Sequence, residues 1–487
     1  MSGQFPYMIW PFNFKKFDED SFLLVNEAGD HLFLSSAQFK SFVSYELPKS
    51  ENLYQTLESS QFVSGEDIGL SVNLAATKYR TRKRFLTNFT ALHMMVVTVR
   101  CNHRCRYCQV SSEAEETSKF DMSPETARRV TDCIFQAPGR DIKIEFQGGE
   151  PLCNWETVTA TIEHAEELNK TCGKNLEFVL CTNLTLINEE QLKFLRDHRV
   201  SISTSLDGDR EIHDKNRRLR TGGSSYDLFM KKLDLARSIC GDAISALMTT
   251  TRDNLPILNK VVDEYFEKGF PGIFLRPLNP YGFASQNAHD LGYPIEEFVK
   301  AYRKTIDYII QLNLKGRTFV EYYAKILLTR ILTPFSTGFV DLQSPAGTGI
   351  SGVIYDYNGE VYPADEARML ARMGDTHFKM GNVFDDSYLD MFRGRIITEI
   401  VENSCVETLP GCISCAYRAY CGADPVRNYL ECKDIVGHRP TSGFCKKYLG
   451  LFDFLFQKLQ RGNEDELDVL WSWITQHNLM EVRGEDD

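Results

Sequence analysis

The chain has 487 residues, which is too long for one average domain and predicts two or three. Its net charge of −12 argues against a nucleic-acid partner. No apolar run approaches the roughly 20 residues that cross a bilayer. Met1–Gln4 lacks the basic and apolar features of a signal peptide. Fourteen cysteines in such a chain indicate metal or redox use in a reducing compartment, so we expect a cytoplasmic protein without a membrane partner.

Residues 1–90 form a first region. Two short strands are predicted within residues 22–34, around an Asn-Glu-Ala-Gly-Asp turn, and a helix follows from Ser36. This order resembles the winged-helix peptide-recognition modules attached to peptide-modifying enzymes. A cap packed on the next domain is the alternative interpretation. The basic stretch 77–84 predicts a solvated linker.

Residues 91–280 alternate strand and helix patterns. The helix signals include Ser123-Pro124, Asn154 as a cap, and Gly173 and Gly269 as stops. Such alternation predicts parallel pairing with right-handed crossovers. Six units fall short of a closed eight-unit barrel, so we expect an α/β fold built on a partial (β/α)6 barrel. The six predicted strands are 92–99, 142–146, 176–181, 200–205, 244–250 and 272–277.

The first of these strands ends in three cysteines, Cys101, Cys105 and Cys108, spaced C-x3-C-x2-C with Tyr107 before the last. Three thiolates on one loop can hold three irons of a [4Fe–4S] cluster and leave the fourth iron without a protein ligand. An electron-transfer ferredoxin normally supplies four cysteines, so the open iron is the informative feature. Structural zinc, which takes four ligands, is the alternative.

At these residues the chain resembles the radical S-adenosylmethionine (SAM) superfamily. Two further motifs match in order: Gly148-Gly149-Glu150-Pro151 and the segment Ser203–Gly208, which contains Ser205 and Asp207. The resemblance implies that SAM chelates the open iron and is cleaved to a 5′-deoxyadenosyl radical. It also implies SAM-binding roles for a set of residues: Tyr107, Gly148, Gly149, Glu150, Asn183, Ser205 and Asp207.

Residues 281–345 predict a helical connector, with helices at 302–314 and 322–332. Gly347–Gly352 formally matches G-x-G-x-x-G, but that fingerprint needs a strand before it and a helix after it. The following residues, 353–362, instead predict a hairpin with an Asn-Gly turn. We therefore reject a dinucleotide site.

A second cysteine group, Cys412, Cys415 and Cys421, is spaced C-x2-C-x5-C, with Cys445 further along. It resembles the C-terminal SPASM domain, which carries auxiliary iron–sulfur clusters in peptide-acting radical SAM enzymes. In that family a distal cysteine supplies the fourth ligand, which implies Cys445 here with Cys432 as the competitor.

The full pattern also has cysteines on both sides of the hairpin, and they are missing here, so one auxiliary [4Fe–4S] cluster is expected. A zinc knuckle is the alternative. Whether Cys405 ligates a cluster stays open. The expected domain limits are 1–90, 91–280, 281–345, 346–450 for the SPASM-like domain, and 451–487 for an acidic helical tail.

Asp365 follows the hairpin at the place where sulfatase-maturing relatives carry an aspartate thought to take the substrate proton. The resemblance therefore implies a general base at Asp365. The alternative is a salt bridge to Arg368 or a turn cap. Glu366 and Arg217 rank lower as residues that line the site.

The chain most resembles the maturase family of the His-Xaa-Ser peptide system, and the resemblance covers nearly its whole length. The motifs that carry it lie at 25–29 and 362–369. The resemblance implies a ribosomally made precursor peptide as substrate, a side-chain cross-link (cyclophane) as product, and reduced flavodoxin or ferredoxin as electron donor. Thioether formation or epimerisation is the alternative reaction. An iron–sulfur carrier or peptide-binding scaffold is the non-enzymatic alternative.

Overall fold

Parallel strands form the centre of an open, curved sheet in the computed structural model, which describes residues 6–65 and 68–484. The strand order is β14-β12-β10-β9-β8-β6-β16-β17-β18. The six expected strands are all present, and those that pair do so in parallel. Their bounds are β6 (Leu92–Thr98), β8 (Asp141–Gly148), β9 (Asn175–Cys181), β10 (Ser201–Ser205), β12 (Ile244–Thr249) and β14 (Leu275–Arg276).

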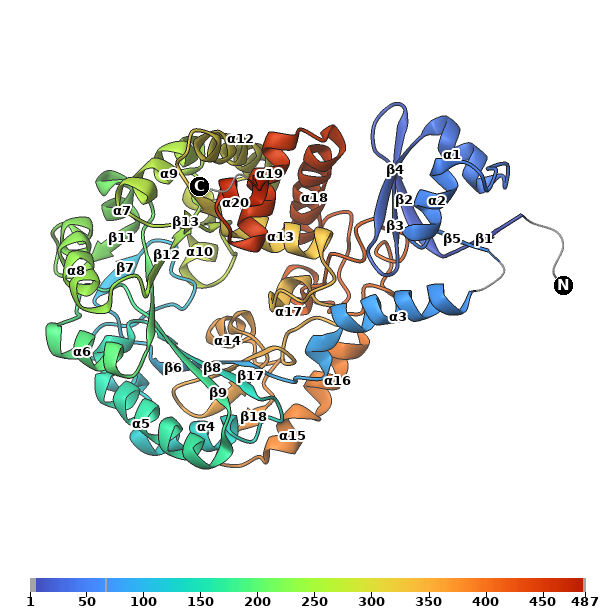
Figure 1. The fold of residues 1–487 in the computed structure, drawn as a ribbon. Coiled ribbons are helices and arrows are strands. Elements are labelled where there is room, and N and C mark those ends of the chain that lie inside the picture. The colour runs from blue at the N-terminus through green and yellow to red at the C-terminus, as the bar shows by residue number, and fades with distance from the viewer. Residues whose placement is uncertain (1–5, 66–67, 485–487) are drawn as a thin grey trace.

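The last expected strand is divided. β13 (Gly272–Ile273) pairs with β15 (Val320–Glu321), whereas β14 pairs with β12. The sheet nevertheless keeps the open α/β barrel form, with helices around its outer side (Figure 1). These helices are α4 (Pro124–Ile134), α5 (Trp155–Cys172), α6 (Glu189–Asp197), α7 (Arg210–Asn216), α8 (Ser225–Cys240) and α9 (Leu258–Glu267).

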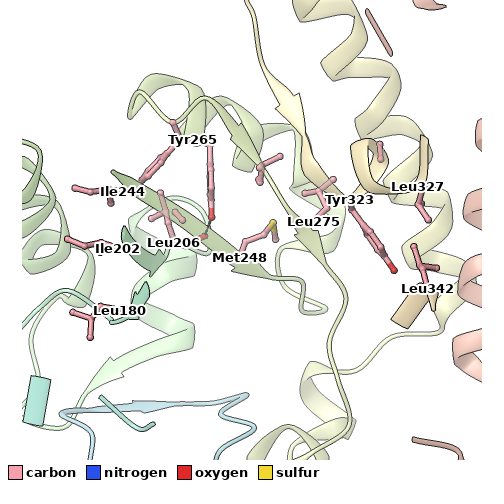
Figure 2. Packing of buried hydrophobic residues seen from close by; sticks show 14 of the residues in the cluster. Leu180, Ile202, Leu206, Ile244, Met248, Tyr265, Leu275, Tyr323, Leu327 and Leu342 are labelled. Atoms are coloured by element: carbon pink, nitrogen blue, oxygen red, sulfur yellow. Dashed lines mark hydrogen bonds between the residues drawn. The ribbon is translucent and has the colours of Figure 1, made fainter. Parts of the chain in front are cut away.

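Branched and aliphatic side chains on neighbouring strands form the main core. Leu180, Ile202 and Ile244 occupy paired positions on β9, β10 and β12, and Figure 2 shows them side by side. All three are buried. Successive side chains of a strand point to opposite faces of the sheet. The polar side chains of these strands therefore lie on the inner face of the barrel.

Helix ends follow the sequence signals with one exception. Ser123 caps α4 by accepting from the Thr126 amide, and Gly173 ends α5 in the left-handed region at φ +60°. We expected Asn154 to cap α5, and it does occupy the N-cap position, but its side chain accepts no amide of the first turn. Its amide instead donates to the carbonyls of Val97 and Met122, at 2.7 and 3.0 Å, so it ties α5 to the end of β6.

The hairpin predicted after the glycine-rich stretch is present as β16 (Gly352–Tyr355) and β17 (Glu360–Tyr362), followed by β18 (Gly381–Asn382). No helix directly follows Gly347–Gly352, which agrees with rejecting a dinucleotide site. β16 pairs in parallel with β6, so the C-terminal part of the chain extends the barrel sheet. Helix α14 (Asp365–Arg372), which follows the hairpin, lies inside the ring of the barrel in Figure 1.

The N-terminal region has its own antiparallel sheet of β2 (Phe12–Lys16), β3 (Ser21–Asn26) and β4 (His31–Ser35). Its core joins Leu24 and Leu34 to Phe42 and Phe62. The sequence patterns did not predict strand β2. The other elements are β1 (Met8–Ile9), β5 (Val63–Ser64), α1 (Ser36–Val43), α2 (Asn52–Ser59) and α3 (Gly69–Arg82).

The expectation of a solvated basic linker at 77–84 is wrong at Arg82, the last residue of helix α3. Arg82 is 6% exposed, and its guanidinium donates to the carbonyls of Ala28 and Arg330. A guanidinium keeps its charge when buried if carbonyl oxygens accept its donors. The N-terminal region is therefore joined to the rest of the protein through α3.

Connector and tail helices form one layer. Helices α12 (Ile295–Leu314) and α13 (Tyr322–Leu332) pack against α18 (Gly443–Arg461) and α19 (Glu464–Thr475), and α20 (Leu479–Arg483) follows (Figure 1). The remaining helices are α10 (Gly282–Gln286), α11 (Ala288–Leu291), α15 (Tyr388–Phe392), α16 (Arg395–Glu402) and α17 (Pro425–Cys432). No helix in residues 6–65 and 68–484 has both the length and the apolar character needed to cross a bilayer.

A buried carboxylate, Glu321, joins this layer to the barrel. It accepts from the Leu275 amide at 3.0 Å, the Ala324 amide at 2.6 Å and the Tyr302 hydroxyl at 2.6 Å. We expect Tyr302→Phe to lower the free energy of unfolding by about 1–3 kcal/mol, because the buried carboxylate loses a donor. Urea unfolding followed by circular dichroism measures this change.

Tyr308→Phe is the matched control. Tyr308 lies on the same helix and donates to Asp263, which is half-buried, so its loss should cost less than about 1 kcal/mol. An equal cost for the two variants would contradict the structural role given to Glu321.

Candidate active site

The first cysteine group lies on the loop that leaves β6. Cys101 is buried, and Cys105 belongs to a short strand, β7 (His103–Cys105). This strand pairs with β11 (Arg217–Leu219), so that Cys105 lies opposite Arg217. The β7–β11 pairing, which was not predicted, joins the cysteine loop to the segment that follows α7.

The surroundings of the thiols suit metal-bound sulfur. The His103 amide donates to the sulfur of Cys101 at 3.3 Å, and the Asn183 amide group lies 3.8 Å from the same sulfur. Burial raises the pKa of the Cys105 thiol to about 12 and that of Cys101 well above its ordinary value. Without a metal these thiols keep their protons, whereas iron binding requires and stabilises the thiolates. The three cysteines therefore fit an iron–sulfur cluster.

Two glycines bring the end of β8 against this loop. A Cβ on Gly148 would lie 2.0 Å from the Thr98 carbonyl oxygen, and a Cβ on Gly149 would lie 2.3 Å from that of Arg100. The Gly149 amide donates to Thr98 at 2.9 Å, and the Glu150 amide donates to Arg100 at 2.7 Å. Any side chain at these two positions would push the cysteine loop away from the sheet.

Glu150 binds the residues that follow the next strand, β9. Its fully buried carboxylate accepts from the Thr182 hydroxyl at 2.6 Å and from the amides of Asn183 and Leu152 at 2.7 and 3.1 Å. Burial raises its pKa to about 7. In turn Asn183 donates to Asn102 in the cysteine loop at 2.8 Å. The carboxylate thus positions Asn183 beside Cys101.

Asp207 is fully buried behind the loop. It accepts from the Tyr107 hydroxyl, and its carboxylate lies 3.3 Å from Nε of Arg217. The guanidinium of Arg217 also lies over the Tyr107 ring, 5.3 Å from its centre. This arrangement makes Asp207 a residue that orients Tyr107, while Ser205 ends β10 in a half-buried position. SAM contacts for Tyr107, Ser205 and Asp207 stay predictions.

The second cysteine group is brought together. Cys412, Cys415, Cys421 and Cys445 all line one cavity, and Nε of Arg439 donates to the Cys412 sulfur at 3.1 Å. Burial raises the pKa of Cys421 well above its ordinary value, and so do the neighbouring Cys415, Cys412 and Cys445. Four thiols around one cavity with a cationic donor fit the four cysteine ligands of a [4Fe–4S] cluster.

The competing cysteines lie elsewhere. Cys432 is exposed and its thiol donates to the Asn428 carbonyl, whereas that of Cys405 donates to Val401. Within the described residues, no three His, Cys, Asp or Glu side chains are arranged to hold a single ion. Cluster ligands bind separate irons, so their sulfurs need not meet at one point.

A larger cavity of about 350 Å³ lies between the barrel sheet and the C-terminal part of the chain. Met94 and Leu247 of the barrel line one side, and Asp365 and Glu366 of α14 line the other. Arg368 does not pair with Asp365. It is 1% exposed, and Nη2 lies 3.1 Å from the Asp356 carboxylate, so the salt-bridge alternative for Asp365 is wrong. The turn-cap alternative stands, because the Asp365 carboxylate accepts the Glu366 amide at 3.1 Å.

Residues 95–268 match the Radical SAM superfamily. The chain carries a radical SAM domain. The family uses a [4Fe–4S] cluster and SAM, which when bound supply a 5′-deoxyadenosyl radical that abstracts a hydrogen atom. The protein is therefore an enzyme, and its own residues bind, orient and shield these groups.

Relatives cover different shares of the chain. The cysteine-type anaerobic sulfatase-maturating enzyme of Clostridium perfringens (strain 13 / Type A) is 24% identical over 372 residues, which are 74% of this chain and 94% of that enzyme. The radical SAM cyclopropyl synthase TigE of Paramaledivibacter caminithermalis is 25% identical over 229 residues, 44% of this chain and 46% of that one.

Solved structures share the fold. Native anSMEcpe with bound AdoMet and Cp18Cys peptide superimposes with a TM-score of 0.63 at 20% identity, over 76% of this chain and 98% of that one. Streptococcus suis SuiB bound to precursor peptide SuiA does so with a TM-score of 0.54 at 14% identity, over 90% of this chain and 100% of that one. The partial barrel with its C-terminal extension is thus a known arrangement.

We expect Gly149→Ala to lower the rate of SAM cleavage by about 10²-fold, because the new methyl group would displace the cysteine loop. Deoxyadenosine formation by the reduced, cluster-reconstituted enzyme measures this rate. Gly65→Ala is the control, since the nearest atom to its Cβ is 3.9 Å away. A wild-type rate in Gly149→Ala would show that the loop tolerates displacement.

Substitution of the fourth thiol should separate the two candidate ligands. In Cys445→Ser we expect a loss of about four irons per chain, because the second cluster loses a ligand. The exposed Cys432→Ser is the matched control and should keep all its iron. Iron analysis and absorbance after anaerobic reconstitution give the readout, and the reverse result would assign Cys432 as the ligand.

Proposed function

We propose that the protein is a maturase that modifies a ribosomally made precursor peptide by hydrogen abstraction. One observation carries the proposal: the carboxylates of Asp365 and Glu366 line a cavity inside the barrel of a radical SAM enzyme. The sulfatase-maturating relatives, and the fold shared with two structures that hold peptides, support a peptide as substrate.

The product that we propose is a side-chain cross-link, formed between an aromatic ring and a nearby β-carbon. Thioether formation or epimerisation is the second candidate, and reduced flavodoxin or ferredoxin is the proposed electron donor. The N-terminal region, with its three-stranded sheet and helices, is proposed to hold the leader of the precursor peptide.

Within the cavity the two neighbouring carboxylates differ. Burial raises the pKa of Glu366 well above its ordinary value, and the adjacent Asp365 raises it further. The raised pKa favours the protonated form of Glu366. Asp365 accepts the Glu366 amide at 3.1 Å and shares a side-chain hydrogen bond with Glu366. It is the group that we propose takes a proton from the substrate.

The substrate for the test comes from the short open reading frames beside the gene. We expect one of them to encode a peptide with His-Xaa-Ser repeats. Reduced enzyme, SAM and this peptide are incubated without oxygen, and the peptide mass and deoxyadenosine are measured. Loss of two hydrogens from the peptide is expected for a cross-link. Deoxyadenosine without any change in the peptide would refute this substrate.

We expect Asp365→Asn to uncouple the two readouts. The amide keeps the shape of the side chain but cannot take a proton, so modified peptide should fall by about 10²–10⁴-fold while deoxyadenosine still forms. Modification at the wild-type rate would make Asp365 a structural carboxylate.

A further inference from the structure

A third cavity, of about 620 Å³, lies at the N-terminal ends of the barrel strands. Leu92, Asp141 and Asn175, which are the first residues of β6, β8 and β9, line it. The cysteine loop leaves the other end of β6. The third cavity therefore lies at the end of the barrel opposite the cysteine loop.

This cavity connects two parts of the molecule that the proposed function uses. Thr81, in the last turn of α3, lines it on the side of the N-terminal region. Leu92 and Gly338 line both the third cavity and the cavity of Asp365 and Glu366, called here the carboxylate cavity. A peptide with its leader on the N-terminal region and its reacting segment at Asp365 has to cross from α3 to the carboxylate cavity. The third cavity touches both ends of this interval.

The wall of the third cavity contains a buried carboxamide without partners. Gln343 lines the cavity and is 2% exposed, and in the described part of the chain neither its Nε2 nor its Oε1 has a hydrogen-bond partner. The buried hydroxyl of Ser351, which also lines the cavity, has none either. Buried polar side chains nearly always have partners, so these atoms point to a ligand.

Glycines make room for this carboxamide and for its main chain. A Cβ on Gly347 would lie 1.8 Å from Oε1 of Gln343, so any side chain at 347 would displace the carboxamide. The Gln343 amide donates to the Val340 carbonyl at 3.2 Å, and a Cβ on Gly422 would lie 2.6 Å from the Gln343 carbonyl oxygen. The backbone around Gln343 therefore holds the unpartnered group in place.

The charged side chains around the cavity do not ask for a charged ligand. Lys143 pairs with Glu177 at 2.9 Å, and Asp141 accepts from the Asn175 amide group at 2.8 Å. Arg84 is exposed to solvent. The chemistry of the ligand therefore follows from the buried groups, which are neutral.

The Gln343 carboxamide presents a donor and an acceptor side by side. A peptide unit carries the complementary acceptor and donor, and both are free in an extended segment outside a helix or sheet. Phe335, which lines the cavity and is 61% exposed, adds apolar surface for a side chain of such a segment. The volume is within the range of ligand-binding cavities.

We propose that the third cavity binds an extended segment of the substrate peptide between its leader and its reacting residues, and that Gln343 binds the main chain of this segment through both atoms of its carboxamide. The proposal deepens the proposed function and rests on a peptide being the substrate. Because the contact is to the main chain, it is independent of the side chains of that segment.

The test measures binding without turnover, with two synthetic probes. The first is a fluorescently labelled octapeptide of alternating glycine and alanine, capped at both ends. The second has its four central nitrogens methylated, which removes their N–H donors. Both are titrated against the cluster-reconstituted enzyme with SAM and no reductant, and fluorescence polarisation gives Kd. We expect the unmethylated peptide to bind about fivefold more tightly, because it keeps a hydrogen bond to Gln343.

Gln343→Met keeps the length of the side chain and removes both the donor and the acceptor. We expect it to weaken binding of the unmethylated peptide by about tenfold and to remove the difference between the two peptides. Its Tm should stay the same or rise, since an unpartnered buried polar group is replaced by an apolar one. A structural role for Gln343 would instead lower Tm.

Gly347→Ala tests the same contact without removing the carboxamide. Its methyl group displaces Oε1 of Gln343, so we expect a similar loss of affinity. Gln136→Met is the matched control: Gln136 is exposed and lies outside the cavity, so this variant should bind both peptides as the wild type does. Equal binding of the two peptides by the wild type, no binding of either, or wild-type affinity in Gln343→Met would overturn the proposal.

Turnover of the peptide encoded beside the gene separates this inference from the proposed function. Modification of that peptide with an unchanged KM in Gln343→Met would refute the main-chain contact alone. A preference for the unmethylated probe, without a change of mass in any peptide after reductant is added, would refute the maturase proposal alone.

Discussion

The close passage of two backbones at the end of β6 determines the geometry of the active site. Gly148 and Gly149 lie so near the carbonyls of Thr98–Arg100 that neither position has room for a Cβ. This contact brings Glu150 to the strand ends, and Glu150 in turn holds Asn183 beside Cys101. The cysteine loop therefore takes its position from main-chain contacts, which vary less than contacts between flexible side chains.

Distant parts of the chain line the cavity of about 350 Å³. β16 pairs with β6, and α14 follows the same hairpin, so the carboxylates of α14 face barrel side chains across the cavity. The second cysteine group connects to this wall through α18, because Lys447 lines the cavity and lies two residues after Cys445. The sheet thus sets the spacing between the cysteine loop after β6 and the carboxylates of α14.

Local patterns in the sequence predicted the barrel strands, the parallel pairing and both cysteine groups. They did not predict the β7–β11 and β6–β16 pairings, because short strands carry little periodicity and their partners lie more than 100 residues away. The stacking of Arg217 on Tyr107 was missed for the same reason. Arg82 was misjudged because carbonyl acceptors from remote segments, which the sequence does not show, make its burial possible.

The order in which the sheet is completed has a consequence for biosynthesis. β16 leaves the ribosome about 260 residues after β6, the strand beside which it finally lies. Until then, β6 is the last strand on its side of the sheet, and Met94 and Val96 lack the neighbours that later cover them. A fragment that stops before residue 350 keeps this open, apolar strand edge, a geometry that favours association between chains.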